Sequence, residues 1–141
     1  MANGLSVKDR ATGRVSARVI DRADAATLVP FVEQRTDCGA LVFSDGHAAY
    51  SMLARRHEVV AHSVGEYVRG MAHTNGIESF WALMKRGYAG TFHHMSAKHL
   101  HRYVAEFEAR HNQRVTAAKG RLAGLAAGCD GKRLDWATLT R

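Results

Sequence analysis

The segment from His73 to Arg86 predicts an amphipathic helix, and it constrains the fold more than any other part of the sequence. Its apolar side chains recur at i, i+3, i+4 and i+7, the spacing of one helix face, at Ile77, Phe80, Trp81 and Met84. Asn75 is expected to cap this helix, with Glu78 three residues later as in a capping box. Because such a stripe must be buried, the helix needs other elements to pack against.

A carboxylate and a lysine accompany the apolar stripe. Glu78 lies near the expected start of the helix, and Lys85 follows seven residues later. Each has an ordinary explanation, because Glu78 can serve the capping box alone and Lys85 can be a solvated helix residue. The helix therefore brings an acid and a base to the edge of a core. There, the two side chains either take part in a reaction or are ordinary surface residues.

Strand-like and helix-like patterns alternate along the chain. Gly4 to Lys8 and Arg14 to Ile20 predict the two arms of a β-hairpin. The further expected elements are a helix at 24–34, a buried strand at 39–44, a helix at 47–56, a strand at 57–62, a connector at 65–72, the helix at 76–86, a glycine-rich loop at 87–91 and a long helix at 96–112. Alternation of this kind favours an α/β sheet with helices packed on it.

The long helix at 96–112 carries a second apolar stripe, formed by Leu100, Tyr103, Val104 and Phe107. The segment from Val115 to Arg141 is rich in alanine, glycine and basic residues. With 141 residues the chain is expected to form one domain, comprising a body at 1–114 and a basic tail at 115–141.

The composition indicates which kind of binding partner and which cellular compartment to expect. Lysine and arginine number 20 against 13 acidic residues, a net charge of +7, which favours a polyanion such as nucleic acid over a merely basic protein. Cys38 and Cys129 have the spacing of neither a zinc site nor a disulfide framework, which suits a reducing compartment. No apolar run reaches the roughly 20 residues of a membrane span, and no signal peptide is evident, so we expect a cytoplasmic protein without a membrane partner.

Asp45 follows a predicted buried strand, and strand ends are where α/β sheets assemble their sites. Taken alone, Asp45 is better explained as part of an ordinary Asp-Gly turn, because such turns are common. Asp45 and Glu78 together offer the oxygen ligands that Mg²⁺ prefers, and two such metals can flank a phosphodiester. Lys85 would hold a phosphate beside them. The remaining backbone contacts would come from a basic face comprising Arg86, Lys98, Arg102, Arg110 and Arg114.

Other chemistries fit the sequence less well. His93 and His94 are adjacent and make a poor chelate, and no His-Glu-x-x-His pattern occurs. The sequence contains neither a nucleotide-binding P-loop nor a serine nucleophile elbow. Trp81 is expected to lie in the core or at its rim instead of stacking on bases.

Several segments together resemble bacterial insertion-sequence transposases of the ISXO type. The similarity is carried by His-Thr-Asn-Gly-Ile-Glu-Ser-Phe-Trp-Ala-Leu-Met-Lys-Arg-Gly at 73–87, Gly-Thr-Phe-His-His-Met-Ser at 90–96, Lys-His-Leu-His-Arg-Tyr-Val-Ala-Glu-Phe at 98–107, Lys-Asp-Arg-Ala-Thr-Gly-Arg-Val at 8–15, Phe-Ser-Asp-Gly-His-Ala-Ala-Tyr at 43–50 and Gly-Lys-Arg-Leu at 131–134. The resemblance covers nearly the whole chain.

This resemblance implies a ribonuclease-H-like mixed sheet with flanking helices and a DDE-type centre. Such a centre uses Mg²⁺ or Mn²⁺ to cut transposon ends and to join the freed 3′-hydroxyl to target DNA. By motif, Asp45 corresponds to the second aspartate and Glu78 to the glutamate, both as metal ligands. Lys85 corresponds to the lysine associated with DNA, and Asn75 lies in the same motif. The implied partners are transposon-end and target DNA, with a homo-oligomer or an intact transposase.

The sequence departs from the family pattern at the first catalytic aspartate, which belongs on a first, central strand that the sequence does not show. Asp9, in the hairpin turn, and Asp21, at the end of the second arm, are poorly placed to replace it. We therefore expect a truncated transposase catalytic domain that is inactive by itself. The alternatives are a non-catalytic DNA-binding module and a fragment that assembles with another transposase chain.

Overall fold

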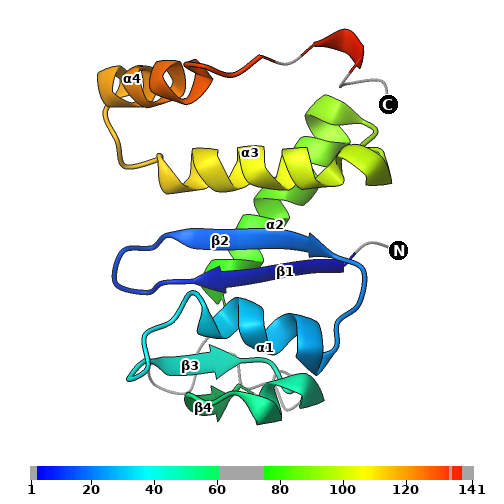
Figure 1. The fold of residues 1–141 in the computed structure, drawn as a ribbon, viewed down its shortest axis with the longest axis vertical. Helices are drawn as coiled ribbons and strands as arrows, with labels where there is room; N and C mark the ends of the chain where they lie inside the picture. Colours follow the sequence, from blue (N-terminus) through cyan, green and yellow to red (C-terminus); the bar gives the residue numbers. More distant parts are fainter. Residues whose placement is uncertain (1–2, 61–74, 134, 138–141) are drawn as a thin grey trace.

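The computed structural model describes residues 3–60, 75–133 and 135–137, and it confirms the α/β class (Figure 1). The strands are β1 (Asn3–Lys8), β2 (Val15–Ile20), β3 (Leu41–Ser44) and β4 (Arg56–Val59). The longer helices are α1 (Ala25–Glu33), α2 (Asn75–Gly87), α3 (Leu100–Asn112) and α4 (Ala118–Cys129). Three short helical segments complete the description: η1 (Ala48–Met52), η3 (Tyr88–Phe92) and η4 (Ala97–His99).

The predicted hairpin is confirmed. β1 and β2 pair antiparallel, with Lys8 opposite Val15 and Asn3 opposite Ile20. Gly13 in the connecting turn has a φ of 69°, a left-handed conformation that glycine adopts without strain. Since side chains alternate between the two faces of a sheet, the hairpin can pack helices on both sides.

One face of the hairpin supports the main core, built with α2 and α3. Its buried members are Val15, Phe80, Met84, Val104 and Phe107, with Ile77, Trp81 and Leu100 among the half-buried residues packed around them. Phe80 is completely buried, at 0% exposure. Both predicted helix stripes are thereby confirmed as core faces. Trp81 lies at the rim, where its indole N–H donates to the Ser6 hydroxyl at 2.8 Å.

The outer edge of β2 is closed by side chains from α3. The Asn112 amide accepts from the Val15 N–H and donates to the Val15 carbonyl, both at 2.7 Å, while the Glu108 carboxylate accepts from the Ala17 N–H at 2.8 Å. In an antiparallel pair, residues directly opposite each other point their backbone N–H and C=O groups either both inward or both outward. Lys8 and Ser6 are opposite Val15 and Ala17, so their backbone groups point away from β2, at the other edge of β1. No strand among the described residues pairs with that edge.

A second core joins the hairpin's other face to α1. Leu5, Ile20, Leu28 and Phe31 are buried there, and Val7, Ala49 and Tyr50 pack against them. Asp24 caps α1, as its carboxylate accepts from the Thr27 N–H at 2.9 Å. The predicted helix at 24–34 is thus confirmed, with Pro30 tolerated inside it.

The sheet differs from the single mixed sheet that was expected. β3 and β4 pair parallel to each other, and β1 and β2 pair antiparallel, but in the described part of the chain they form two separate two-stranded sheets. The α/β class therefore holds at the coarse level. The arrangement of all strands in one ribonuclease-H-like sheet remains a prediction.

Two elements between residues 45 and 60 were predicted too long. The expected helix at 47–56 is a five-residue 3₁₀ helix, because Leu53 adopts an extended conformation and the Ala54 N–H donates to Glu33 at 2.9 Å. The expected strand at 57–62 begins at Arg56 and ends at Val59. Residues 61 and 62 and the predicted connector at 65–72 lie outside the described part.

Two helical segments were not predicted. The glycine-rich stretch expected as a loop is the π-helix η3, which ends at His93 with a left-handed φ of 55°. The expected tail contains α4, whose residues are all exposed, including Leu122 at 68% and Leu125 at 57%. Its mixture of alanine and glycine lacks an apolar period, so the sequence pattern did not reveal it.

We expect Asn112→Ala to lower the free energy of unfolding by about 2 kcal/mol, because it leaves a donor and an acceptor of Val15 without partners in a partly buried place. Urea denaturation followed by circular dichroism measures this. Arg110→Ala is the matched control on the same helix, since its ion pair with Glu106 is 70% and 50% exposed and such pairs contribute little. Equal stability of the two variants would contradict the proposed edge closure.

Candidate functional site

Asp45 lies directly after the carboxyl end of β3, as the sequence predicted, and its side chain is exposed. Its carboxylate accepts a long hydrogen bond from the His47 N–H at 3.4 Å, typical of an aspartate that begins a turn. The residue before it, Ser44, is buried at 8% exposure. A buried strand end thus presents an open carboxylate to solvent.

The main chain of Asp45 is held by two polar side chains that the sequence reading did not single out. The Ser44 hydroxyl donates to the Asp45 carbonyl at 2.7 Å, and the same hydroxyl oxygen lies 2.7 Å from Nε2 of His57 on β4. His57 is opposite Val42 in the parallel register, two residues before the partner of Ser44, so both side chains share one face. Only the strand register brings them together, and no sequence spacing signals it.

Tyr50 on η1 completes the surroundings of Asp45. Its ring lies between those of His47 and His57, with centroid separations of 6.0 and 6.2 Å. Burial raises the pKa of Tyr50 above its ordinary value, and the negative charge of Asp45 raises this pKa further. The pKa of the Tyr50 phenol therefore depends on the charge of the Asp45 carboxylate.

Glu78 and Lys85 are both exposed on α2, in its first and last turns respectively. Their charges suit the positive and negative ends of the helix dipole. Asn75 is the first residue of the helix, and its side chain lies outside the description, so the predicted cap remains a prediction.

Three of the predicted basic residues, Arg86, Lys98 and Arg102, lie where α2 ends and α3 begins, two ends that lie close together in Figure 1. The other two, Arg110 and Arg114, lie at the opposite end of α3, so the predicted basic face is not continuous. Arg86 and Lys98 are exposed, and Arg102 is half-buried on α3. Partial burial, followed by the charges of Arg102 and Lys98, lowers the pKa of nearby His99. Burial is the larger cause of this lower pKa, and the positive charges nearby add to it.

The two carboxylates belong to different parts of the fold. Asp45 follows β3 of the parallel sheet, whereas Glu78 lies on α2, which packs against β1 and α3. Their oxygen donors are of the kind that Mg²⁺ or Mn²⁺ takes. Within the described residues, however, no three or more histidine, cysteine or acidic side chains form a group that could hold a metal. The donors fit the metal in kind, and the described part does not complete a site.

The two other aspartates considered from the sequence have different surroundings. Asp9 is engaged in the hairpin turn, where its carboxylate accepts from the Ala11 N–H at 2.8 Å and from the Thr12 hydroxyl at 2.5 Å. These bonds, led by that of Thr12, lower the pKa of Asp9. Asp9 therefore serves the turn of the hairpin.

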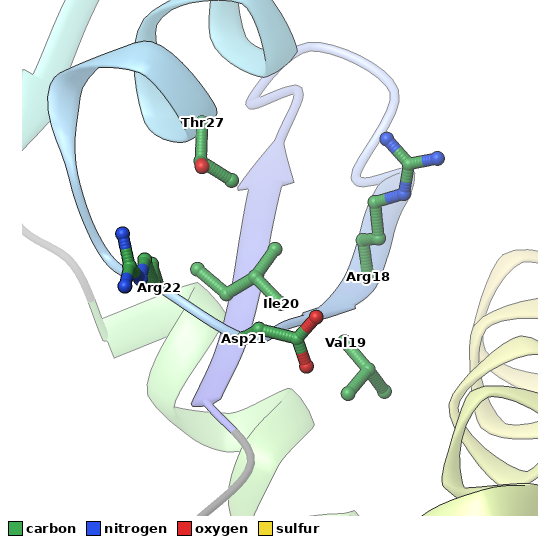
Figure 2. Close-up of a pocket in the computed structure, with 6 residues that line it drawn as sticks. All are labelled: Arg18, Val19, Ile20, Asp21, Arg22 and Thr27. Atoms are coloured by element: carbon green, nitrogen blue, oxygen red, sulfur yellow. The ribbon is translucent and has the colours of Figure 1, made fainter.

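Asp21 lines an open hollow of about 460 Å³ between the end of β2 and α1 (Figure 2). Arg18 and Arg22 also line it, but Figure 2 shows their guanidinium groups directed away from each other, with Asp21 between their backbones. The hollow does not concentrate charge of one sign and does not form a recognisable anion site.

We expect Asp45→Asn to lower the pKa of Tyr50, because it removes the negative charge that opposes ionisation of the phenol. The pKa should remain above its ordinary value, since burial, the larger cause, persists. Titration of the assigned Tyr50 ¹³Cζ resonance measures this. Asp37→Asn, at another exposed carboxylate, should leave the titration unchanged; an unchanged Tyr50 pKa in Asp45→Asn would refute the coupling.

No helix in the described part of the chain is long and apolar enough to cross a membrane. Comparison with curated proteins finds no match. Comparison with solved structures finds none either. A protein-family model described as the ISXO2-like transposase domain matches residues 4–112, which include both candidate carboxylates, Lys85 and the basic residues near the start of α3. The chain therefore belongs to the ISXO2-like transposase family, whose members act in DNA transposition.

Proposed function

We propose that this domain takes part in metal-dependent cleavage of transposon ends and in joining the freed 3′-hydroxyl to target DNA. The observation that carries the proposal is the exposed carboxylate of Asp45 directly after the carboxyl end of β3, inside the segment that matches the transposase family; β3 itself is buried only at Ser44, and not along its length as the sequence predicted. Glu78, exposed on α2 in the same matched segment, would supply the second carboxylate.

Asp45 and Glu78 would hold Mg²⁺ or Mn²⁺ through carboxylate oxygens. When bound, such metals stabilise the charge that develops on the attacking and leaving oxygens of a phosphodiester. The side chains of this domain would then bind and orient the DNA. Lys85, two helical turns beyond Glu78 on α2, would hold a phosphate close to the reacting bond.

The wider DNA contact is proposed for the basic surface where α2 ends and α3 begins. Arg86, Lys98 and Arg102 would each engage the phosphate backbone, with Asn75 near the start of α2. The net charge of +7 favours such a contact. Phosphate contacts fix position and register on DNA without specifying its sequence.

A complete centre requires a third acidic ligand in addition to Asp45 and Glu78. We propose that an added segment, such as one from an intact transposase, supplies this ligand from a strand paired with β1, and that the 141 residues alone are inactive. The β1 edge supports this assembly, because no strand of the described residues pairs with it and exposed edges accept added strands, while the β2 edge is occupied by Asn112 and Glu108. An interaction fragment is thus the second candidate function.

We expect the purified chain with Mg²⁺ or Mn²⁺ to give no strand-transfer product from a pre-cut transposon end. Addition of the N-terminal segment of an intact ISXO2-like transposase, as a separate chain, should restore product, and Glu78→Gln should abolish it. Gel analysis of labelled DNA measures both. Product from the unsupplemented chain that Glu78→Gln abolishes would overturn the requirement for an added segment.

DNA binding should depend steeply on salt. The double variant Lys85→Ala, Arg102→Ala should reduce the slope of log affinity against log salt concentration by about 1.8, since each duplex phosphate contact contributes about 0.9. Fluorescence anisotropy at several salt concentrations measures this. Arg22→Ala, which removes an exposed charge on the segment between β2 and α1, should leave the slope unchanged.

The same binding assay separates catalysis from simple DNA binding. Asp45→Asn should leave salt-dependent binding intact and affect only the metal-dependent reaction. If neither Lys85→Ala, Arg102→Ala nor their combination alters the slope, the proposed DNA surface is wrong.

A further inference from the structure

We infer that Ser44 and His57 form a positioning pair that fixes the backbone of Asp45 for metal binding. The inference rests on the proposed metal role of Asp45 and extends it to two residues outside the expected ligand set. It is carried by the chain of hydrogen bonds from His57 Nε2 through the Ser44 hydroxyl to the Asp45 carbonyl, with both separations 2.7 Å.

The direction of these hydrogen bonds follows from the number of hydrogen atoms. A carbonyl oxygen only accepts, so the single hydroxyl hydrogen of Ser44 is used in donating to Asp45. The hydroxyl oxygen must therefore accept from His57, which requires a proton on Nε2. Neutral His57 is thus held as the Nε2–H tautomer, and the hydroxyl is satisfied in both directions.

Burial makes this arrangement rigid. Ser44 is 8% exposed and His57 is half-buried beside the Tyr50 ring, with the two ring centroids 6.2 Å apart. Hydrogen bonds with little access to water are costly to break, because the separated groups lose their partners without full hydration. The pair therefore anchors the last peptide of β3 to β4.

The anchored peptide sets the direction of the Asp45 side chain. Its carbonyl is fixed by Ser44, while within the described residues the hydrogen bond of its carboxylate is the long 3.4 Å contact with the His47 N–H. The backbone is consequently constrained, and the carboxylate oxygens stay open to a cation. Metal sites commonly depend on such outer partners, and loss of one lowers metal affinity about 10- to 100-fold.

Three variants test the positioning pair in the 141-residue chain. Ser44→Ala removes the hydroxyl that links His57 to the Asp45 carbonyl, and His57→Ala removes the N–H that donates to this hydroxyl. His57→Gln retains an N–H donor near the position of Nε2. His101→Ala, at an exposed histidine on α3, is the matched control. Amide spectra of each variant establish that its fold is retained.

The first readout does not depend on metal. Long-range ¹H–¹⁵N correlation at about pH 9, where ordinary histidine is neutral, should show His57 protonated at Nε2. The ¹⁵N heteronuclear NOE at Gly46 and His47 should fall in Ser44→Ala and His57→Ala and stay at the native value in His57→Gln and His101→Ala. Protonation at Nδ1 alone, or native NOE values in both disruptive variants, would overturn the positioning role.

The second readout uses Mn²⁺ as the probe. With the N-terminal segment of an intact ISXO2-like transposase added to complete the ligand set, Mn²⁺ should broaden the amides of Asp45 and Gly46. The apparent Kd should rise about 10-fold in Ser44→Ala and His57→Ala, with His57→Gln within about twofold of the native chain. Native affinity in both disruptive variants would show that the pair does not serve metal binding. Absence of broadening around Asp45, with the NOE changes intact, would instead overturn the proposed metal role and leave the backbone anchoring established.

Discussion

Burial of Phe80 against the β-hairpin is the contact on which the described fold depends. Phe80 is completely buried and lies in one cluster with Val15 of β2 and with Val104 and Phe107 of α3. A two-stranded hairpin is only marginally stable alone, so it needs this helical cover. The same cluster positions α2, and with it Glu78 at one end of the helix and Lys85 near the other. The helix α2 therefore both packs into the core and carries two of the candidate site residues.

Local sequence patterns predicted the parts of the fold that depend on neighbouring residues. The hairpin, α1 and the buried stripes of α2 and α3 were predicted because alternation and helical periodicity report directly on which face is buried. The patterns failed where a tertiary contact decides the outcome or where a helix has no apolar face. The Ala54 N–H bonds to Glu33 and helps end a helix early, and α4 has no apolar period to reveal it.

The candidate site divides in a similar way. Asp45, Glu78 and Lys85 could be selected from residue type, position and family motif, and the structure places all three on the surface. The roles of Ser44 and His57 could not be selected, because their contact arises from the parallel register of β3 and β4. Sequence spacing reports poorly on a bond between neighbouring strands, since the connection between them can have any length. The residues that hold a functional side chain in place are therefore harder to predict from sequence than the functional residue itself.

Closure of one hairpin edge has a consequence for self-association. Strand pairing between copies propagates into fibres only when each hairpin offers two free edges, one for each neighbour. Asn112 and Glu108 occupy the β2 edge, so two copies that meet through their β1 edges would form a symmetric pair with no further hairpin edge to extend. Two side chains on α3 would thus limit any such strand pairing between copies to a dimer.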